Sequence, residues 1–461
     1  MPHSTVSRRR FIATTGIASL AVWSRPSAAL HGQTAARPTT GIHPFSIEGD
    51  RLVVPRGRFC VGGREIEVKT RTELRIAPAD VVTVRDEELF LSAKKPSGFF
   101  AGTQLRGTKA KNIGAMHALI EDSLTLRDAE GRTLRKDDDY LVSARFSLLG
   151  LGANPSVTVE TKVFASYSYF TQRIDAVVVD AAGAVSLVLG TPRLASPDLP
   201  AVPAAATAIC TLYRPFRGRT LREEHVFPIV ASAEAAPTVT RRGRIPKTLR
   251  KLESGEPVTI VCWGDSITVG ADVNPEDAWA NALPRALRQK FPRAAIAHKN
   301  HSIGGTKTAQ WLHNGDYAGL PKQNSEKCRF ENILNEKPDL VVMEFLNDIV
   351  FAEDVLQRTY RTIHEQFAAR GIEWVIVTPS QKIPENFDLA EMKDGQPRRL
   401  DNFLRRFAAE HGYALADAAA RWKHLYKEGI PYFAMFNNGY NHPNASGHRL
   451  FVEEILKCFH T

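Results

Sequence analysis

The sequence predicts an antiparallel β domain followed by an α/β domain with a mostly parallel sheet, and three observations support this. Apolar residues recur at every second position over parts of residues 45–230, which is typical of antiparallel strands. From about residue 248, short apolar runs alternate with longer helical patterns, as in α/β folds. The length of 461 residues exceeds what one ordinary core accommodates, so two domains and a leader are expected.

The first 29 residues have the features of an export signal. Arg8, Arg9 and Arg10 precede a short apolar stretch, and small residues follow at positions 27–29. This order of charge, apolar block and cleavage site resembles a twin-arginine signal peptide. We therefore expect export from the bacterial cytoplasm, with the mature protein in the periplasm or secreted. No later apolar run is long enough to span a bilayer, so stable membrane insertion is not expected.

Composition argues against several other classes of protein. The formal net charge is +10, but basic and acidic residues are interspersed beyond the leader, which does not favour a nucleic-acid-binding surface. The five cysteines are widely scattered, with no CxxC pair and no metal-ligand spacing. The sequence therefore predicts no disulfide framework, no metal site and no cofactor.

Residues 45–230 are expected to form a β-sandwich or jelly-roll-like accessory domain. Alternation is clearest over residues 64–76, 123–135 and 157–180, and clusters of turn-forming residues separate these runs. Small and polar residues dominate the stretch 231–247, which is therefore the predicted linker to the second domain.

The second domain, residues 248–461, is predicted from short strands that alternate with helices. Such alternation implies right-handed crossovers and a parallel sheet with helices on both faces. The predicted strands cover residues 258–262, 294–298, 339–344, 374–378 and 413–416. The predicted helices cover residues 277–291, 325–335, 352–370, 397–411, 418–427 and 444–459. Because ligands bind beyond the carboxyl ends of parallel strands, the residues just after each strand are the candidates for chemistry.

Residues suited to acyl transfer follow these strands. Ser266 comes just after the first strand, "NHSIGGTKT" (300–308) follows the second and "FLNDIV" (345–350) follows the third. The stretch "NNGYNHPNASGH" (437–448) lies near the C-terminus. A serine hydroxyl needs a base such as histidine, and the oxyanion needs donors such as a glycine amide or an asparagine side chain. All three kinds of group are present in these loops.

Four short motifs resemble the sequence blocks of the SGNH, or GDSL, hydrolase superfamily. They are Gly264-Asp265-Ser266-Ile267, Gly305 within "NHSIGG", Asn347-Asp348 and His442-Pro443, in the family's order. The resemblance implies a flavodoxin-like three-layer fold around the parallel sheet. It also implies a nucleophile at Ser266, a base at His442, and an oxyanion hole formed by the Ser266 and Gly305 amides and the Asn347 side chain.

Two positions depart from the family pattern. A glycine usually lies two residues before the asparagine of the third block, whereas this chain has Phe345, from which we expect a bulkier backbone region around the acyl pocket. The acid that usually lies three residues before the histidine is replaced by Gly439. Three arrangements remain open: a Ser-His dyad, orientation of His442 by a backbone carbonyl, or orientation by a distant acid, for which Asp417 is the candidate.

These features together predict an exported serine esterase that removes acetyl or other short acyl esters from a carbohydrate. Export and the appended β domain favour a polysaccharide or oligosaccharide substrate, and the ending "W-x-x-L-x-x-x-G-I-P … N-H-P-N-x-x-G-H" resembles carbohydrate-acting members of the family. One alternative is a non-catalytic carbohydrate-binding protein with a degenerate hydrolase domain. The other is a thioesterase or lipid-acting hydrolase that shares the mechanism but has a different pocket.

Overall fold

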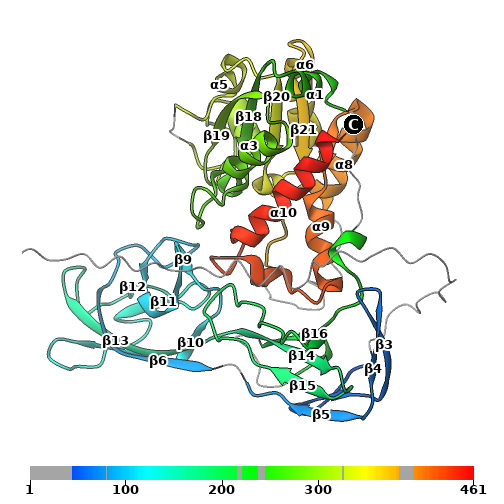
Figure 1. The fold of residues 1–461 in the computed structure, drawn as a ribbon. Coiled ribbons are helices and arrows are strands. Elements are labelled where there is room, and N and C mark those ends of the chain that lie inside the picture. The colour runs from blue at the N-terminus through cyan, green and yellow to red at the C-terminus, as the bar shows by residue number, and fades with distance from the viewer. Residues whose placement is uncertain are drawn as a thin grey trace, which may run out of the picture.

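The computed structural model describes residues 44–78, 80–214, 221–236, 244–323, 326–383 and 398–460. The predicted export signal, residues 1–29, lies outside these ranges, as do residues 237–243 of the predicted linker. Within the described chain, antiparallel sheets make up the N-terminal half and an α/β layered structure makes up the C-terminal half (Figure 1). The predicted fold class is therefore confirmed.

A five-stranded parallel sheet forms the centre of the C-terminal half. Its strands are β18 (Pro257–Gly264), β19 (Ala295–Ser302), β20 (Leu340–Glu344), β21 (Glu373–Val377) and β22 (Ala414–Ala416). Their order across the sheet is β19-β18-β20-β21-β22, and every neighbouring pair is parallel. This is the flavodoxin-like order, in which the chain turns from one side of β18 to the other. The resulting switch point lies between β18 and β20, at their carboxyl ends.

Helices cover both faces of this sheet and give the predicted three layers. The helices of this half are α1 (Pro246–Ser254), α2 (Ser266–Val269), α3 (Trp279–Lys290), α4 (Thr308–Leu312), α5 (Phe330–Asn335), α6 (Glu353–Ala368), α8 (Arg399–His411), α9 (Ala418–His424) and α10 (Ala445–Leu456). Apolar side chains of α1, α3, α9 and α10 pack against one face in a single core, and those of α5, α6 and α8 pack against the other in a second core. Alternate strand residues point to opposite faces, so Ile260 joins the first core and Val261 the second.

The N-terminal half consists of small antiparallel sheets. The larger of them are β15-β14-β16-β17, β10-β13-β6, β11-β12-β7 and β1-β2-β5. The strands are β1 (Ser46–Glu48), β2 (Arg51–Val54), β3 (Gly57–Val61), β4 (Arg64–Val68), β5 (Thr72–Arg75), β6 (Val81–Phe90), β7 (Thr103–Gln104), β8 (Lys109–Ala110), β9 (Ile113–Gly114), β10 (Leu119–Asp128), β11 (Tyr140–Ser143), β12 (Leu148–Leu151), β13 (Lys162–Phe170), β14 (Arg173–Asp180), β15 (Val185–Val188), β16 (Ala206–Arg214) and β17 (Val226–Pro228). Two larger cores and a small cluster around Ala110, Ala115 and Ala118 lie in this half, and the antiparallel sheets fit the predicted β-sandwich.

The antiparallel sheets pack against the loop 431–444, which leads into α10. Phe146 and Tyr213 from the sheets share one core with Phe433 and Tyr440 from this loop. The ring centroids of Tyr213 and Phe433 lie 4.3 Å apart, and those of Phe146 and Tyr440 lie 6.1 Å apart. In Figure 1 the ends of α9 and α10 reach down to the antiparallel sheets. The two halves are thus joined through the segment that carries His442.

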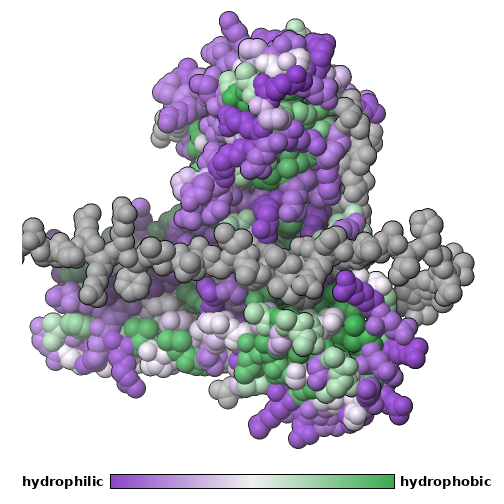
Figure 2. All heavy atoms as spheres, viewed as in Figure 1, coloured by the Kyte–Doolittle hydropathy of each residue, from purple (hydrophilic) through white to green (hydrophobic). Residues whose placement is uncertain are grey.

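The surface differs between the two halves. The visible face of the α/β half is mainly hydrophilic, whereas apolar residues gather on the outer face of the antiparallel half (Figure 2). None of the helices in the described ranges has both the length and the apolar character needed to cross a bilayer.

Candidate active site

The site begins with a tight turn at the end of β18. A Cβ atom at Gly264 would lie 2.0 Å from the Thr268 hydroxyl oxygen and 2.3 Å from the Glu344 carbonyl oxygen, so only glycine fits there. The next residue, Asp265, caps the short helix α2 by accepting a hydrogen bond of 3.0 Å from the Ile267 amide. Ser266 is consequently the first residue of α2, where its backbone N–H has no acceptor within the helix.

Ser266, His442 and Asp272 form a continuous chain of hydrogen-bonding groups. The Ser266 Oγ lies 3.0 Å from His442 Nε2, and His442 Nδ1 lies 2.5 Å from Asp272 Oδ2. The side chains of His442 and Asp272 are only 11% and 9% exposed, so water screens their interaction little. With Nδ1–H donating to the carboxylate, Nε2 is free to accept the serine proton. The arrangement has the geometry of a serine-histidine-acid triad.

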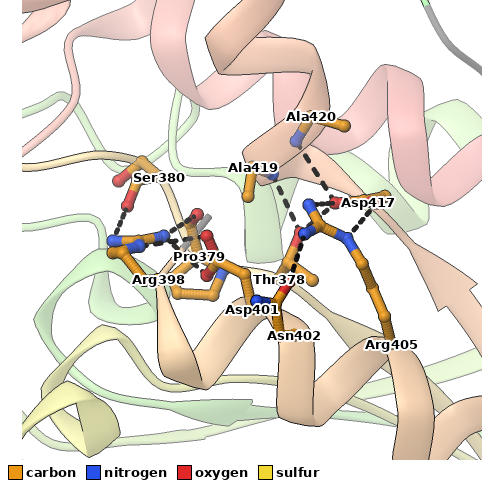
Figure 3. Close-up of polar contacts among 10 residues, drawn as sticks. All are labelled: Thr378, Pro379, Ser380, Arg398, Asp401, Asn402, Arg405, Asp417, Ala419 and Ala420. Carbon is orange, nitrogen blue, oxygen red and sulfur yellow. Dashed lines mark hydrogen bonds and ion pairs between the residues drawn. The ribbon is translucent and has the colours of Figure 1, made fainter. Parts of the chain in front are cut away.

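The prediction of Asp417 as the acid is wrong. Asp417 accepts hydrogen bonds from Arg405 Nε at 2.7 Å and Nη2 at 2.9 Å, from the Thr378 hydroxyl at 2.9 Å and from the Ala420 amide at 3.2 Å (Figure 3). It therefore caps α9 and binds that helix to α8 and β21. It follows β22, which is an edge strand three positions from β18. At about 4.8 Å per strand, the carboxyl ends of β18 and β22 are about 14 Å apart.

Asp272 lies in the loop after α2, six residues beyond Ser266, and was not predicted. The loop turns sharply there, because Gly270 and Asp272 have φ angles of +80° and +69°. A Cβ at Gly270 would lie 2.3 Å from the Cβ of Ala278, which leaves no room for a side chain. The Asp272 carbonyl also accepts a hydrogen bond of 2.9 Å from Asn437 Nδ2. The acid is thus tied both to its own loop and to the loop of His442.

The loop around His442 is organised by one asparagine side chain. Asn438 Oδ1 accepts hydrogen bonds of 3.0 Å from the amides of Tyr440, Asn441 and His442. Asn444 then caps α10, since its Oδ1 accepts a bond of 3.0 Å from the Gly447 amide. These bonds fix the backbone on both sides of His442 without any acid inside the loop.

Two buried carboxylates join the strand ends behind the site. Asp265 Oδ2 accepts a hydrogen bond of 2.9 Å from the Asn347 amide, which links the first and third motifs. Asp348 accepts bonds from the Thr308 amide at 3.0 Å and hydroxyl at 2.7 Å, and from the Tyr360 hydroxyl at 3.1 Å. Burial raises the pKa of Asp265 to about 6 and that of Asp348 to about 7. Both groups hold loops together and lie out of hydrogen-bond contact with His442.

The predicted oxyanion donors lie in two loops near Ser266. Asn347 is half-buried in the 3₁₀ turn 346–350 after β20, at the switch point of the sheet. The glycine pair after β19 passes beside the nucleophile, because a Cβ at Gly304 would lie 3.7 Å from Ser266 Cβ. Gly305 follows with a φ angle of +76° and open space around its Cβ position. The roles of the Ser266, Gly305 and Asn347 donors stay predictions.

Phe345 lies in the core on one face of the parallel sheet. Its side chain is 2% exposed and points away from the switch point into the core shared with α5, α6 and α8. The ring contacts Trp263 edge-on, with centroids 5.3 Å apart. Phe345 and Trp263 point to the same face of the sheet, and the expectation of a bulkier backbone region around the acyl pocket stays a prediction.

Among the residues that the structure describes, no group of three or more His, Cys, Asp or Glu side chains could hold a metal ion. Cys210, Cys262, Cys328 and Cys458 are buried, and Cys60 is exposed.

Comparisons with known proteins identify the C-terminal half. Residues 262–450 match the model of the GDSL-like Lipase/Acylhydrolase family, so the predicted resemblance is confirmed and this part of the chain is a GDSL-like acylhydrolase domain. The match supports the prediction of an ester hydrolase. No curated protein sequence matches the chain.

Several solved structures resemble the chain at low identity. A two-domain esterase active on acetylated mannans is 19% identical with a TM-score of 0.36, and the match covers 48% of this chain and 53% of that one. A member of the lipolytic G-D-S-L family from Veillonella parvula is 21% identical with a TM-score of 0.31, covering 43% and 96%. A mutant of an acetyl-xylooligosaccharide esterase from Geobacillus Stearmophilus is 18% identical with a TM-score of 0.34, covering 44% and 94%. The chain thus spans about half the length of the two-domain esterase.

Proposed function

We propose that the chain is an exported serine esterase that removes acetyl or other short acyl groups from a carbohydrate, with residues 262–450 as its catalytic domain. The observation that carries this proposal is the hydrogen-bonded chain from Ser266 through His442 to Asp272. A buried carboxylate, an imidazole and a hydroxyl in this order activate a serine for attack on an ester carbonyl.

Acylation starts when the Ser266 Oγ attacks the ester carbonyl while His442 Nε2 takes the hydroxyl proton. Asp272 holds the imidazole in the tautomer with the proton on Nδ1 and stabilises the positive charge that forms. The amides of Ser266 and Gly305 and the side chain of Asn347 donate to the oxyanion. The protonated His442 then gives its proton to the leaving sugar oxygen as the carbon–oxygen bond breaks, which releases the sugar hydroxyl and leaves the acyl group on Ser266.

Deacylation reverses these roles with water as the nucleophile. His442 takes a proton from water, the hydroxide formed attacks the acyl carbonyl, and the same donors hold the second oxyanion. Collapse releases the carboxylic acid, and His442 returns the proton to Ser266. No step needs a group beyond the side chains and amides named here.

The carbohydrate substrate is proposed from features of the sequence. The antiparallel half and the segment 422–448, with its resemblance to carbohydrate-acting family members, support it, as does the export-signal pattern. Periplasmic or secreted location through twin-arginine export is part of the same proposal. The paired substitution Arg8→Lys and Arg9→Lys should keep the full chain in the cytoplasm, and unchanged export would contradict this part.

The activity is tested with the purified full chain on a chromogenic acetate ester. Ser266→Ala should lower kcat/KM by at least about 10³-fold, because the nucleophile is lost. Ser254→Ala is the matched control, since Ser254 ends α1 and precedes β18, so it lies at the opposite end of this strand from Ser266. Full activity of Ser266→Ala would overturn the mechanism.

Substrate class is tested by comparing three substrates under the same conditions. Acetate release from an acetylated polysaccharide should exceed hydrolysis of a long-chain ester and of an acyl thioester. Preference for the thioester or the long-chain ester would favour the lipid-acting alternative. Binding of the polysaccharide without acetate release, together with an inert chromogenic ester, would favour the non-catalytic alternative.

A further inference from the structure

One serine from the antiparallel half contacts both ends of the loop that carries His442. Ser196 lies in the connection between β15 and β16. Its hydroxyl donates a hydrogen bond of 2.8 Å to the Ala434 carbonyl and accepts one of 2.8 Å from Asn444 Nδ2. Ala434 and Asn444 flank the segment 435–443, so a single hydroxyl joins its two ends.

The backbone of Ser196 is itself unusual. Its φ angle is +49°, in the left-handed region that serine rarely adopts. Such strain persists only where surrounding contacts hold it, and it is often found at functional sites. Here it aims the hydroxyl at the His442 loop.

The same part of the antiparallel half packs close to Gly439, the position where the family's acid usually lies. A Cβ at Gly439 would be 3.3 Å from Ala195 Cβ and 4.0 Å from Ala115 Cα. Gly439 also has a φ angle of +66°, which strains any residue with a side chain. Next to it, the ring of Tyr440 packs on Phe99, with centroids 5.4 Å apart. The antiparallel half thus packs along the His442 loop on the side of Gly439.

Resting on the function proposed above, we propose that the antiparallel half is part of the catalytic centre and that Ser196 is a positioning residue for His442. The base and its acid come from different loops, so the distance between them depends on how the two loops are held. Asn437 fixes one side by its bond to the Asp272 carbonyl. Ser196 fixes the other, because it ties the start and the end of the His442 segment to the antiparallel half.

The test is Ser196→Ala in the full chain, assayed on the chromogenic acetate ester. Loss of both bonds lets the His442 segment shift, and since a displacement of about 1 Å in an active site can cost 10²-fold, kcat should fall by about 10-fold to 10²-fold. KM should stay within about twofold, because Ser196 makes no contact with the reacting groups. Ser196→Gly also removes the hydroxyl but relieves the left-handed strain, so it should lose as much kcat with less loss of stability.

Thr211→Val is the matched control. The Thr211 hydroxyl also donates across the interface between the two halves, to the Gly429 carbonyl at 2.5 Å, but outside the His442 segment. This variant should be less stable to urea with kcat unchanged. If kcat in Ser196→Ala stays within about twofold of wild type, or if Thr211→Val loses as much kcat, the positioning role is wrong.

A second readout separates this inference from the proposed function. The proton that His442 Nδ1 donates to Asp272 should give a far-downfield proton resonance, assigned by its loss in Asp272→Asn. It should shift or broaden in Ser196→Ala and stay in place in Thr211→Val. If the wild-type chain hydrolyses no ester, the proposed function fails, but the resonance still tests whether Ser196 positions His442. A changed resonance in Ser196→Ala supports the positioning role, and an unchanged resonance overturns it.

Discussion

Asp272→Asn tests whether the acid six residues after Ser266 replaces the one missing at Gly439. The carboxylate contacts His442 Nδ1 at 2.5 Å, and both side chains are nearly buried. In the transition state the imidazole is positively charged, so the substitution removes an opposite charge from its surroundings. An asparagine amide can also donate to Nδ1, which would leave the proton on Nε2 and block acceptance of the serine proton.

The size of the effect follows from the geometry. Opposite unit charges about 4 Å apart attract by about 4 kcal/mol at an effective dielectric constant of about 20. Since about 1.4 kcal/mol corresponds to a tenfold change in rate, kcat should fall by about 10³-fold. KM should change little, because the charge develops only after the substrate is bound. Steady-state hydrolysis of the chromogenic acetate ester measures both constants.

Asp417→Asn provides the matched control, because this carboxylate is also buried and ion-paired but contacts Arg405 instead of His442. It should lower stability to urea and leave kcat of the folded protein close to wild type. Retention of more than about a third of wild-type kcat in Asp272→Asn would refute the reasoning, and so would a 10³-fold loss in Asp417→Asn.

Three further predictions concern neighbouring groups. Asn347→Ala should lower kcat by about 10²–10³-fold with a small change in KM, since it removes an oxyanion donor, and unchanged kcat would exclude that role. Burial raises the pKa of Asp348 from 3.8 to about 7, so between about pH 4 and 7 this carboxyl is protonated in the folded chain and ionised in the unfolded chain. The free energy of unfolding should therefore fall by about 1.4 kcal/mol for each unit by which the pH rises in this window. Asp348→Asn should make the fall in stability shallower across this window in urea titrations, while Asp265, whose pKa burial also raises, still contributes below about pH 6; an identical slope in the variant would contradict the prediction. Adding Gly439→Asp to Asp272→Asn should not restore kcat, because φ at Gly439 is +66° and Ala195 occupies the space; full recovery would show that the acid can work from either loop.

Most of the parallel sheet could be predicted because β18, β20, β21 and β22 are largely buried and therefore appear as apolar runs, whereas the edge strand β19 is mostly exposed. All five predicted strands are present, and β18 differs from its prediction only by extension to Pro257 and Gly264. The motifs placed Ser266 and Asn347 each just after a predicted strand, and the structure shows that these two strands, β18 and β20, are neighbours. Local pattern was sufficient to place each residue after its strand, because a strand and the loop that follows it are close in sequence.

The acid could not be predicted in the same way. The rule that chemistry follows strand ends correctly placed Asp417 after β22, but it does not say which strand lies next to β18. Asp272 follows a short helix, and the direction of its side chain depends on the left-handed backbone at Gly270 and Asp272. The spacing of six residues between Ser266 and Asp272 does not reveal this conformation. Its partner His442 is 170 residues away. A contact of this range is set by packing between loops and leaves no periodic pattern.

The position of the acid also changes how the two halves of the chain depend on each other. Where the acid lies three residues before the histidine in the same loop, the backbone of that loop fixes the distance between them. Packing of other parts of the chain against the loop then matters little for this distance. Here the seven residues from Ser266 to Asp272 fix nucleophile and acid relative to each other, and the base arrives on a separate loop. That loop is held by Asn437 on one side and by Ser196 of the antiparallel half on the other. On the proposed roles, the segment of the antiparallel half that packs beside Gly439 through Ala195 is also the one that holds His442 within reach of Asp272 through Ser196.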